Sequence, residues 1–279
     1  MYANVCSIGQ NLQELKSTID VLSWNIQMLP DLYSPFSSYV RKKQTKRLPE
    51  IISYLKNSDF DIVVLQEVFD VQMKNKLAKQ LVYTYPYIQL PIKKGIGIKL
   101  SNGIMILSKF PIDYKCHTRF EDSKGTDKMA QKGCVLISVN INNEEWLIAG
   151  THLNSTSQKI RDLQYAQIQK TIIKPYITDK APFILAGDLN TSKNTSSYAK
   201  MMELFQLRCP ELNEQRPFTY DSKNSWNQAN YNVWIDYLLH NLNEKNILKH
   251  YIIRPSMVFK NKTMDLADHY GIALKIAID

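Results

Sequence analysis

Long hydrophobic runs and paired cysteines are both missing from this sequence. No apolar segment approaches the ~20 residues that a membrane-spanning helix needs, and residues 1–20 contain no basic region followed by an apolar one. We therefore expect no transmembrane helix, no Sec-type signal peptide, and a soluble protein that is cytoplasmic or exported by a non-Sec route. The 4 cysteines are widely spaced and include no C-x-x-C pair. We therefore expect neither a zinc site nor a dense disulfide framework. We expect the cysteines to be reduced thiols.

Internal repeats, low-complexity tracts and linkers rich in Gly, Ser or Pro are also missing. Acidic residues are in the minority, because 35 Lys and Arg against 26 Asp and Glu give a formal net charge of +9. This excess favours an anionic partner such as nucleic acid, a phosphorylated metabolite or a lipid headgroup surface, and it fits an ordinary basic surface equally well. The one true basic cluster is RKKQTKR at 41–47.

What recurs along the chain is a short apolar segment that adjoins a polar residue. Such segments are typical of strands in an α/β protein, where catalytic side chains often follow strand ends. The segments are VLSWN, DIVVLQE, NGIMILSK, WLIAGTH, FILAGDLN, WIDYLLHN and ADHYGIALKIAI.

Helical patterns lie between these strands. The spacing i, i+3, i+4, i+7 from Leu48 to Leu55 predicts a helix in which Pro49 is tolerable only in the first turn. Residues 71–82, 157–173 and 196–205 have similar patterns, whereas 84–125 and 206–232 are expected to be loops with short strands. The alternation predicts one α/β domain that covers residues 1–279.

The polar residues at the strand ends form an ordered set. Taken singly, each has a structural explanation as a turn, a cap or a core histidine, but together they predict a catalytic site. The set is Asn25, Glu67, His152, Asp188, Asn190, Asp236, Asp268 and His269. Its oxygen donors, without thiolates or a histidine cluster, suit Mg²⁺ or Mn²⁺ rather than zinc. The other histidines, His117, His240 and His250, are expected at the surface or in loops.

The blocks LSWNIQ, IVVLQEVFD, GTHLNS, AGDLN, WIDYLL and ADHYGIALKI resemble, in order and spacing, those of the endonuclease/exonuclease/phosphatase superfamily. The resemblance runs from about residue 20 to residue 279, which leaves 1–19 as an N-terminal extension. It implies a four-layer α/β sandwich of the DNase I-like kind, with two β-sheets packed face to face and helices outside.

The same resemblance implies roles for the residues. Glu67 becomes the principal Mg²⁺ ligand, with Asn25 and Asp268 as further metal residues and Mn²⁺ or Co²⁺ as substitutes. His269 activates a water that attacks phosphorus directly, and Asp236 orients its imidazole.

His152 steadies the developing charge on the phosphate. Asp188 and Asn190 position the nucleophile and the phosphate, pointing the same way from an extended segment.

Within the superfamily, the segment DKMAQKG resembles the bacterial sphingomyelinase branch, with Asp127 and Lys132 as substrate-binding residues. This implies hydrolysis of sphingomyelin to ceramide and phosphocholine, and an exported protein would then be an effector or toxin. A nuclease acting on DNA or RNA, another phosphatase of the superfamily, and a catalytically dead binding relative are the alternatives. Partners are expected to be a phospholipid or other phosphodiester, and the protein is expected to be a monomer.

Peripheral membrane contact follows from the lipid-directed interpretation. The segment RPSMVFKNKTMDLADHY offers only a weak hydrophobic anchor before the terminal block, through Met257, Val258, Phe259 and Met264. Loop 29–40, with Leu29, Tyr33, Phe36 and Tyr39, is the alternative contact.

Overall fold

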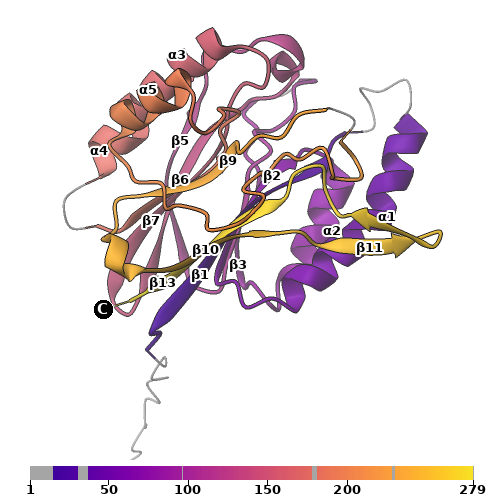
Figure 1. The fold of residues 1–279 in the computed structure, drawn as a ribbon, viewed down its shortest axis with the longest axis horizontal. Coiled ribbons are helices and arrows are strands. Elements are labelled where there is room, and N and C mark those ends of the chain that lie inside the picture. Colours follow the sequence, from indigo (N-terminus) through magenta and orange to yellow (C-terminus); the bar gives the residue numbers. More distant parts are fainter. Residues whose placement is uncertain (1–14, 31–36, 96, 178–180, 228–229, 279) are drawn as a thin grey trace, which may run out of the picture.

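The computed structural model describes residues 15–30, 37–95, 97–177, 181–227 and 230–278. Two β-sheets pack face to face, and helices cover the outer face of each sheet (Figure 1). This arrangement confirms the expected four-layer α/β sandwich. Residues 1–14 of the expected N-terminal extension, and Tyr33 and Phe36 of the expected contact loop, lie outside the described residues.

The first sheet has six strands in the order β10-β13-β1-β2-β4-β3. The central strand β1 pairs in parallel with β2 and antiparallel with β13. The strands are β1 (Thr18–Met28), β2 (Ile62–Val68), β3 (Tyr87–Gln89), β4 (Met105–Ser108), β10 (Ile247–Ile253) and β13 (Gly271–Ala277).

The second sheet has five strands in the order β5-β6-β7-β8-β9. Its one parallel pair is β7 with β8, and the other neighbours are antiparallel. The strands are β5 (Ile112–Arg119), β6 (Gly133–Ile141), β7 (Glu144–His152), β8 (Phe183–Asp188) and β9 (Asp236–His240). A separate two-stranded hairpin joins β11 (Ser256–Phe259) and β12 (Lys262–Asp265).

Helices α1 (Ser37–Lys56) and α2 (Val71–Leu81) cover the first sheet, and they share one apolar core with it. On the second sheet lie α3 (Gln158–Ile168), the π-helical turn Gln169–Ile173, α4 (Lys174–Tyr176) and α5 (Ser196–Phe205). Short 3₁₀ helices span Gly125–Met129 and Glu244–Asn246. The predicted helices at 71–82, 157–173 and 196–205 are confirmed in position.

The prediction for Pro49 was wrong, because Pro49 lies well inside α1 rather than in its first turn. The helix begins earlier than the apolar spacing suggested, and positions 37–40 of the expected contact loop belong to it. Proline removes one helical hydrogen bond. Pro49 itself is exposed, on the solvent side of the helix.

The two sheets approach each other closely at Gly150 of β7. A Cβ atom at this position would lie 2.8 Å from Cγ2 of Ile104 and 2.9 Å from Cγ1 of Val64, both of the opposite sheet. Real Cβ atoms do not pack at such distances, so glycine sets the spacing of the two sheets here.

The structure confirms the expectation for the cysteines and corrects the one for His240. Cys116, Cys134 and Cys209 are free thiols, as expected. His240 was expected at the surface or in a loop, but it is completely buried in β9, because an apolar strand carries it into the core. Among the described residues, no helix has the length and apolar character needed to cross a membrane.

Candidate active site

Three of the predicted residues lie side by side across neighbouring strands of the second sheet. His152 ends β7 and is in register with Asp188, which ends β8. Asp188 is in turn in register with Asp236, which begins the antiparallel strand β9. Strand pairing therefore brings one histidine and two carboxylates to the same edge of the sheet, and all three are buried.

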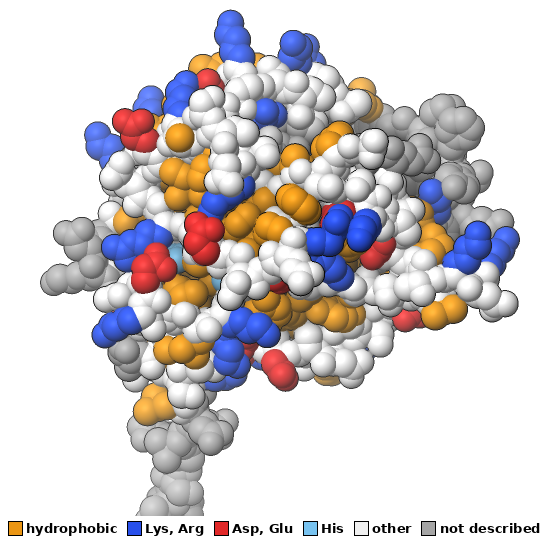
Figure 2. Space-filling model, viewed as in Figure 1, with side chains coloured by type: hydrophobic (Ala, Val, Ile, Leu, Met, Phe, Trp, Pro, Cys, Tyr) orange, Lys and Arg blue, Asp and Glu red, His pale blue; other side chains and the backbone are white. Residues whose placement is uncertain are grey.

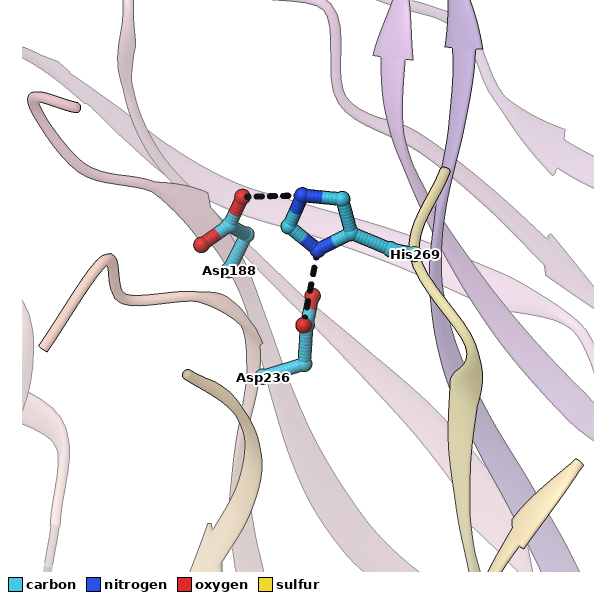
Figure 3. Close-up of side chains that lie close together, drawn as sticks. All are labelled: Asp188, Asp236 and His269. Carbon is cyan, nitrogen blue, oxygen red and sulfur yellow. Dashed lines mark hydrogen bonds and ion pairs between the residues drawn. The ribbon is translucent and has the colours of Figure 1, made fainter. Parts of the chain in front are cut away.

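His269 reaches this row from the first sheet, where it lies two residues before β13. Its Nδ1 atom lies 2.8 Å from Oδ2 of Asp236, and its Nε2 atom lies 3.8 Å from Oδ2 of Asp188 (Figure 3). Burial alone would lower the pKa of His269, but the carboxylates of Asp236 and Asp188 outweigh burial and raise the pKa well above its usual value. The imidazole is thus held in place by charge as well as by a hydrogen bond.

The backbone around His269 is fixed by neighbouring side chains. The indole Nε1 of Trp24 donates to the carbonyl of His269 at 3.0 Å. The ring of Tyr220 packs edge-on against the imidazole, with 5.2 Å between centroids. The hydroxyl of Thr219 accepts from the backbone N–H of Asp236 at 3.1 Å. Both members of the His–Asp pair therefore have a preset position.

Asn25 and Asn190 bracket Asp188 from two sides. Nδ2 of Asn25, on β1, donates to Oδ2 of Asp188 at 3.2 Å, which links the two sheets. The backbone N–H of Asn190 donates to Oδ1 of the same carboxylate at 3.0 Å. The expected extended geometry from Asp188 to Asn190 was wrong, because β8 ends at Asp188 and Asn190 has a left-handed φ of 48°. A turn closed by the aspartate replaces the extended segment.

Glu67 and Asp268 form a second acidic group beside the His–Asp row. Burial and the nearby Asp268 raise the pKa of Glu67 to about 7, and burial also raises the pKa of Asp268. Oδ2 of Asp268 accepts from Nε2 of Gln27 at 2.7 Å, but its Oδ1 is buried without a hydrogen-bond partner. Glu67 is the next-to-last residue of β2 and has a left-handed φ of 60°. The strained backbone of Glu67 lies beside a carboxylate oxygen of Asp268 that has no hydrogen-bond partner. This combination suggests a ligand between the two carboxylates.

The residues present fit a divalent cation. Carboxylate oxygens of Glu67 and Asp268, with the amide oxygen of Asn25, are the hard donors that Mg²⁺ prefers. A cation would also offset the burial that raises both carboxyl pKa values and the repulsion by Asp268 that adds to it at Glu67. Donor atoms of Asp188, Asp236 and His269 likewise lie within 4.8 Å of one another. Because Asp236 already engages Nδ1 of His269, we assign that trio to proton transfer and the Glu67 group to the metal.

Lys132 and Asp127, the predicted substrate-binding residues, lie behind His152 and are not among the residues that line the cavity. Nζ of Lys132 lies 2.7 Å from Oδ1 of Asp127 and 3.0 Å from Nε2 of His152. Asp127 also accepts from Asn154 and from the backbone N–H of Ser155. Both side chains are buried, so their direct contacts are to the protein.

The site opens into a cavity of about 470 Å³. Its floor contains the predicted Glu67, His152, Asp188, Asn190 and His269. Its other lining residues are polar, aromatic and aliphatic, and the sequence did not single them out: Ser155, Gln158, Arg161, Ser192, Thr195, Ser197, Tyr220, Tyr231, Val233 and Ile235. This volume suits a small organic ligand, for which cavities of ~300–1,000 Å³ are usual.

Sequence reasoning also missed the residues that support the acidic group. Arg47, the last residue of the basic cluster at 41–47, is buried and donates to the carbonyls of Ile26, Gln27 and Leu266. Burial lowers the pKa of Arg47 to about 10, while the charges of Asp268 and Glu67 oppose that shift. In sequence the cluster resembles an ordinary basic surface, and no signal there marks Arg47 as a buried residue.

The comparisons with known proteins agree with this geometry. The sequence profile of the Endonuclease/Exonuclease/phosphatase family matches residues 22–269. The chain belongs to this family. The expectation of a phosphoric ester hydrolase is thereby confirmed at the level of the family.

Curated relatives point to one branch. The chain is 29% identical over 257 residues to Sphingomyelinase C 2 of Leptospira interrogans serogroup Icterohaemorrhagiae serovar Lai, with 83% of this chain and 41% of the relative covered. It is 24% identical over 306 residues to Sphingomyelinase C of Bacillus cereus, with 94% and 90% covered. The chain thus spans about two fifths of the length of the Leptospira relative.

Solved structures of the family share the fold. A crystal structure of SmcL superposes with a TM-score of 0.78 at 22% identity, covering 94% of this chain and 99% of that one. A mutant beta toxin from Staphylococcus aureus with bound magnesium ions gives a TM-score of 0.75 at 22% identity, with 93% and 99% covered.

Proposed function

We propose that this chain is a Mg²⁺-dependent phosphodiesterase that hydrolyses sphingomyelin to ceramide and phosphocholine by attack of an activated water on phosphorus. The observation that carries the proposal is a cavity lined by both His269 and Glu67. Behind these two residues, Asp236 bonds His269 and the charge of Asp268 acts on Glu67. The names of the relatives, Sphingomyelinase C from Leptospira and from Bacillus cereus, support the choice of lipid.

The residues divide the chemistry among them. Asp236 holds Nδ1 of His269, which leaves Nε2 as the atom that takes the proton from water when the ring is neutral. Nearby carboxylates raise the pKa of His269 and stabilise the imidazolium that forms. A cation at the Glu67 group would oppose that shift and favour the neutral ring. Asp188 lies beside that Nε2 atom and orients the attacking water. Mg²⁺ held by Glu67, Asp268 and Asn25 would supply positive charge to the phosphate oxygens.

His152 acts as a neutral donor toward the phosphate. Burial, with the charge of Lys132 adding to it, lowers the pKa of His152 well below its usual value. Lys132 donates to its Nε2 atom, so the ring proton belongs on Nδ1, which has no partner among the described residues. That atom is buried, but the ring lines the cavity. We propose that its N–H reaches a phosphate oxygen, as negative charge develops, when substrate is bound.

The cavity wall suits a choline headgroup. The rings of Tyr220 and Tyr231 lie 5.7 Å apart at an angle of 32°, and both line the cavity. Aromatic faces attract quaternary ammonium groups through their quadrupoles. A substrate phosphate at the floor would place its headgroup toward these rings.

The test is phosphocholine release from sphingomyelin vesicles by the purified protein with Mg²⁺, with EDTA, and with the His269→Ala variant. We expect release with Mg²⁺ only, and loss of release in the variant. Phosphatidylcholine vesicles, which carry the same headgroup, test the preference for the sphingolipid. Plasmid DNA is run in parallel, and nicking of DNA without phosphocholine release would contradict the lipid proposal and favour a nuclease on the same catalytic residues.

A further inference from the structure

Strand β1 contains a β-bulge opposite Glu67. The register of β1 with β2 shifts between Asn25 and Met28. Two residues of β1, Ile26 and Gln27, therefore lie opposite the single residue Glu67 of β2. The backbone is left-handed on both sides of the bulge, with a φ of 50° at Gln27 and 60° at Glu67. Because a bulge re-aims the side chains beside it, this one sets the position from which Glu67 reaches the cavity.

The carbonyls of the bulge are bound by Arg47 of helix α1. Its Nη1 atom donates to the carbonyl of Ile26 at 3.2 Å, and its Nη2 atom donates to the carbonyl of Gln27 at 2.7 Å. Consecutive carbonyls of an extended strand point to opposite sides, so the left-handed Gln27 allows both to face one guanidinium. A buried carbonyl without a partner costs free energy. Arg47 therefore stabilises the bulge in this conformation.

The same guanidinium also holds the segment that carries Asp268. Nη1 of Arg47 donates to the carbonyl of Leu266 at 2.8 Å, two residues before Asp268. Gln27 adds a second connection, because its Nε2 atom donates to Oδ2 of Asp268 at 2.7 Å. Arg47 and Gln27 thus tie the bulge opposite Glu67 to the second carboxylate of the proposed metal group.

Arg47 makes these connections from a buried position. Figure 2 shows Lys and Arg side chains projecting from the surface in view, whereas only 2% of the Arg47 surface is exposed. Its three hydrogen bonds go to carbonyls, and its guanidinium lies 5.2 Å from the ring centroid of Trp226. A planar guanidinium that bonds several acceptors fixes their geometry in a way that the point charge of lysine does not.

This arrangement points to a role for Arg47 in metal binding. We propose that Arg47 is a positioning residue that sets the Mg²⁺ affinity of the Glu67 group, because it fixes the bulge opposite Glu67 and ties it to the segment that carries Asp268. The proposal rests on the proposed assignment of Mg²⁺ to this group. Residues that orient metal ligands change metal affinity by about 10–100-fold when they are replaced. Since the charge of Arg47 itself repels a cation, the test keeps the charge and alters the geometry.

The test is titration calorimetry of the purified full chain with Mg²⁺ alone, without substrate. Arg47→Lys keeps the charge and loses the planar fork. We expect it to bind Mg²⁺ about 10–100-fold more weakly than the wild type. In Gln27→Asn the new residue tolerates a left-handed backbone, but its shorter side chain loses the bond to Asp268. We expect this variant to bind Mg²⁺ about tenfold more weakly.

The matched control is Arg208→Lys. Arg208 also donates to a carbonyl, that of Leu242, but it does not line the cavity. We expect its variant to keep the Mg²⁺ affinity of the wild type. Thermal melting without Mg²⁺ checks that each variant is folded, and if Arg47→Lys does not fold, Gln27→Asn decides the question.

The dependence of phosphocholine release on Mg²⁺ separates positioning from a merely structural role. Arg47→Lys should need more Mg²⁺ for its half-maximal rate, and its rate should recover at saturating Mg²⁺, because all the proposed catalytic residues are still present. A structural loss would lower the melting temperature and the rate at every Mg²⁺ concentration, without changing the Mg²⁺ affinity of the folded protein.

Three results would overturn the proposal. Equal Mg²⁺ affinity in the wild type and the folded variants would do so and would leave the proposed hydrolysis of sphingomyelin intact. A rate of Arg47→Lys that stays low at saturating Mg²⁺ would show that Arg47 acts on the catalytic step rather than on metal binding. Absence of Mg²⁺ binding by the wild type would overturn the metal assignment itself, and the role of Arg47 with it.

Discussion

His269 and Asp236 lie 33 positions apart in the chain, yet Nδ1 of the histidine is 2.8 Å from Oδ2 of the aspartate. Asp236 begins β9 of the second sheet, whereas His269 precedes β13 of the first sheet. The hydrogen bond therefore connects the two sheets, and the proposed base is oriented only when they are packed together. This makes the pair the most direct target for mutation.

Asp236→Asn should lower kcat for phosphocholine release by about 10²–10⁴-fold. The amide keeps the size of the side chain, but it no longer stabilises the imidazolium and it permits the wrong tautomer of His269. The measurement is the initial rate at saturating substrate, with far-UV circular dichroism to check folding. His117→Gln, a histidine that does not line the cavity, is the control and should keep its rate. A full rate in Asp236→Asn would contradict the assigned pair.

Mg²⁺ should raise the melting temperature of the wild type, because a ligand that binds only the folded state stabilises it, by about 2.7 kcal/mol at a concentration of 100 times its Kd. Glu67→Gln should reduce this shift strongly and weaken Mg²⁺ binding in calorimetry. Without metal the same variant should be at least as stable as the wild type, because it removes a buried charge that repels Asp268. Asp113→Asn, at an exposed carboxylate, serves as the control. An undiminished shift in Glu67→Gln would rule it out as a ligand.

Gly150→Ala should lower the free energy of unfolding by about 1–3 kcal/mol, because the new methyl group would collide with Ile104 and Val64 of the opposite sheet. Urea denaturation measures the effect. In the double variant Gly150→Ala, Ile104→Ala, the added methyl group meets less crowding. The double variant should therefore lose less stability than the sum of the losses in the two single variants. Strict additivity would mean that the two sheets are not in tight contact here.

Acid should destabilise the protein partly through His240. Burial, with the charge of Arg208 adding to it, lowers the pKa of His240 to about 4 from its usual 6.5. Between these two values the unfolded chain binds the proton and the folded chain does not, so stability falls as the pH drops from 6.5 toward 4. The contribution is about 3 kcal/mol.

The variant His240→Asn isolates this contribution. Asn offers an acceptor for the N–H of Leu242, which His240 Nδ1 accepts at 3.1 Å, and it does not titrate in this range. We expect a lower stability at pH 7 but a shallower decline toward pH 4 than in the wild type, measured by urea denaturation at several pH values. Parallel declines in the two proteins would show that His240 does not contribute.

The polar residues at the strand ends could be predicted because each one directly follows or precedes an apolar run in the sequence. Asp188 and His152 stop apolar runs that have no other reason to end in a carboxylate or an imidazole, and strand register then brings them together. The left-handed φ of Glu67 and Asn190 could not be predicted in this way. These conformations are imposed by bonds to residues far along the chain, such as that from Asn190 Nδ2 to the carbonyl of Leu153 at 3.2 Å.

Supporting residues were harder to foresee. Gln27 matters because it bonds Asp268, and Arg47 because it is buried against three backbone carbonyls. In the sequence, Gln27 is one of many glutamines and Arg47 belongs to a basic cluster, so neither is marked as a supporting residue. Lys132 was predicted to bind substrate; in the structure it contacts Asp127 and His152 and is not among the residues that line the cavity. Tertiary packing, which a single sequence does not encode in any short pattern, decides all three positions.

The order of strands in the first sheet has a consequence for biosynthesis. Strand β1, the first described strand in the chain, lies between β2 and β13, and β13 is the last. During translation one edge of β1 therefore stays unpaired until residues 271–277 have left the ribosome. His269 emerges just before these residues. A nascent chain lacks the proposed base before that moment. The proposed site is therefore complete only after the whole segment from Asn25 to His269 has been made.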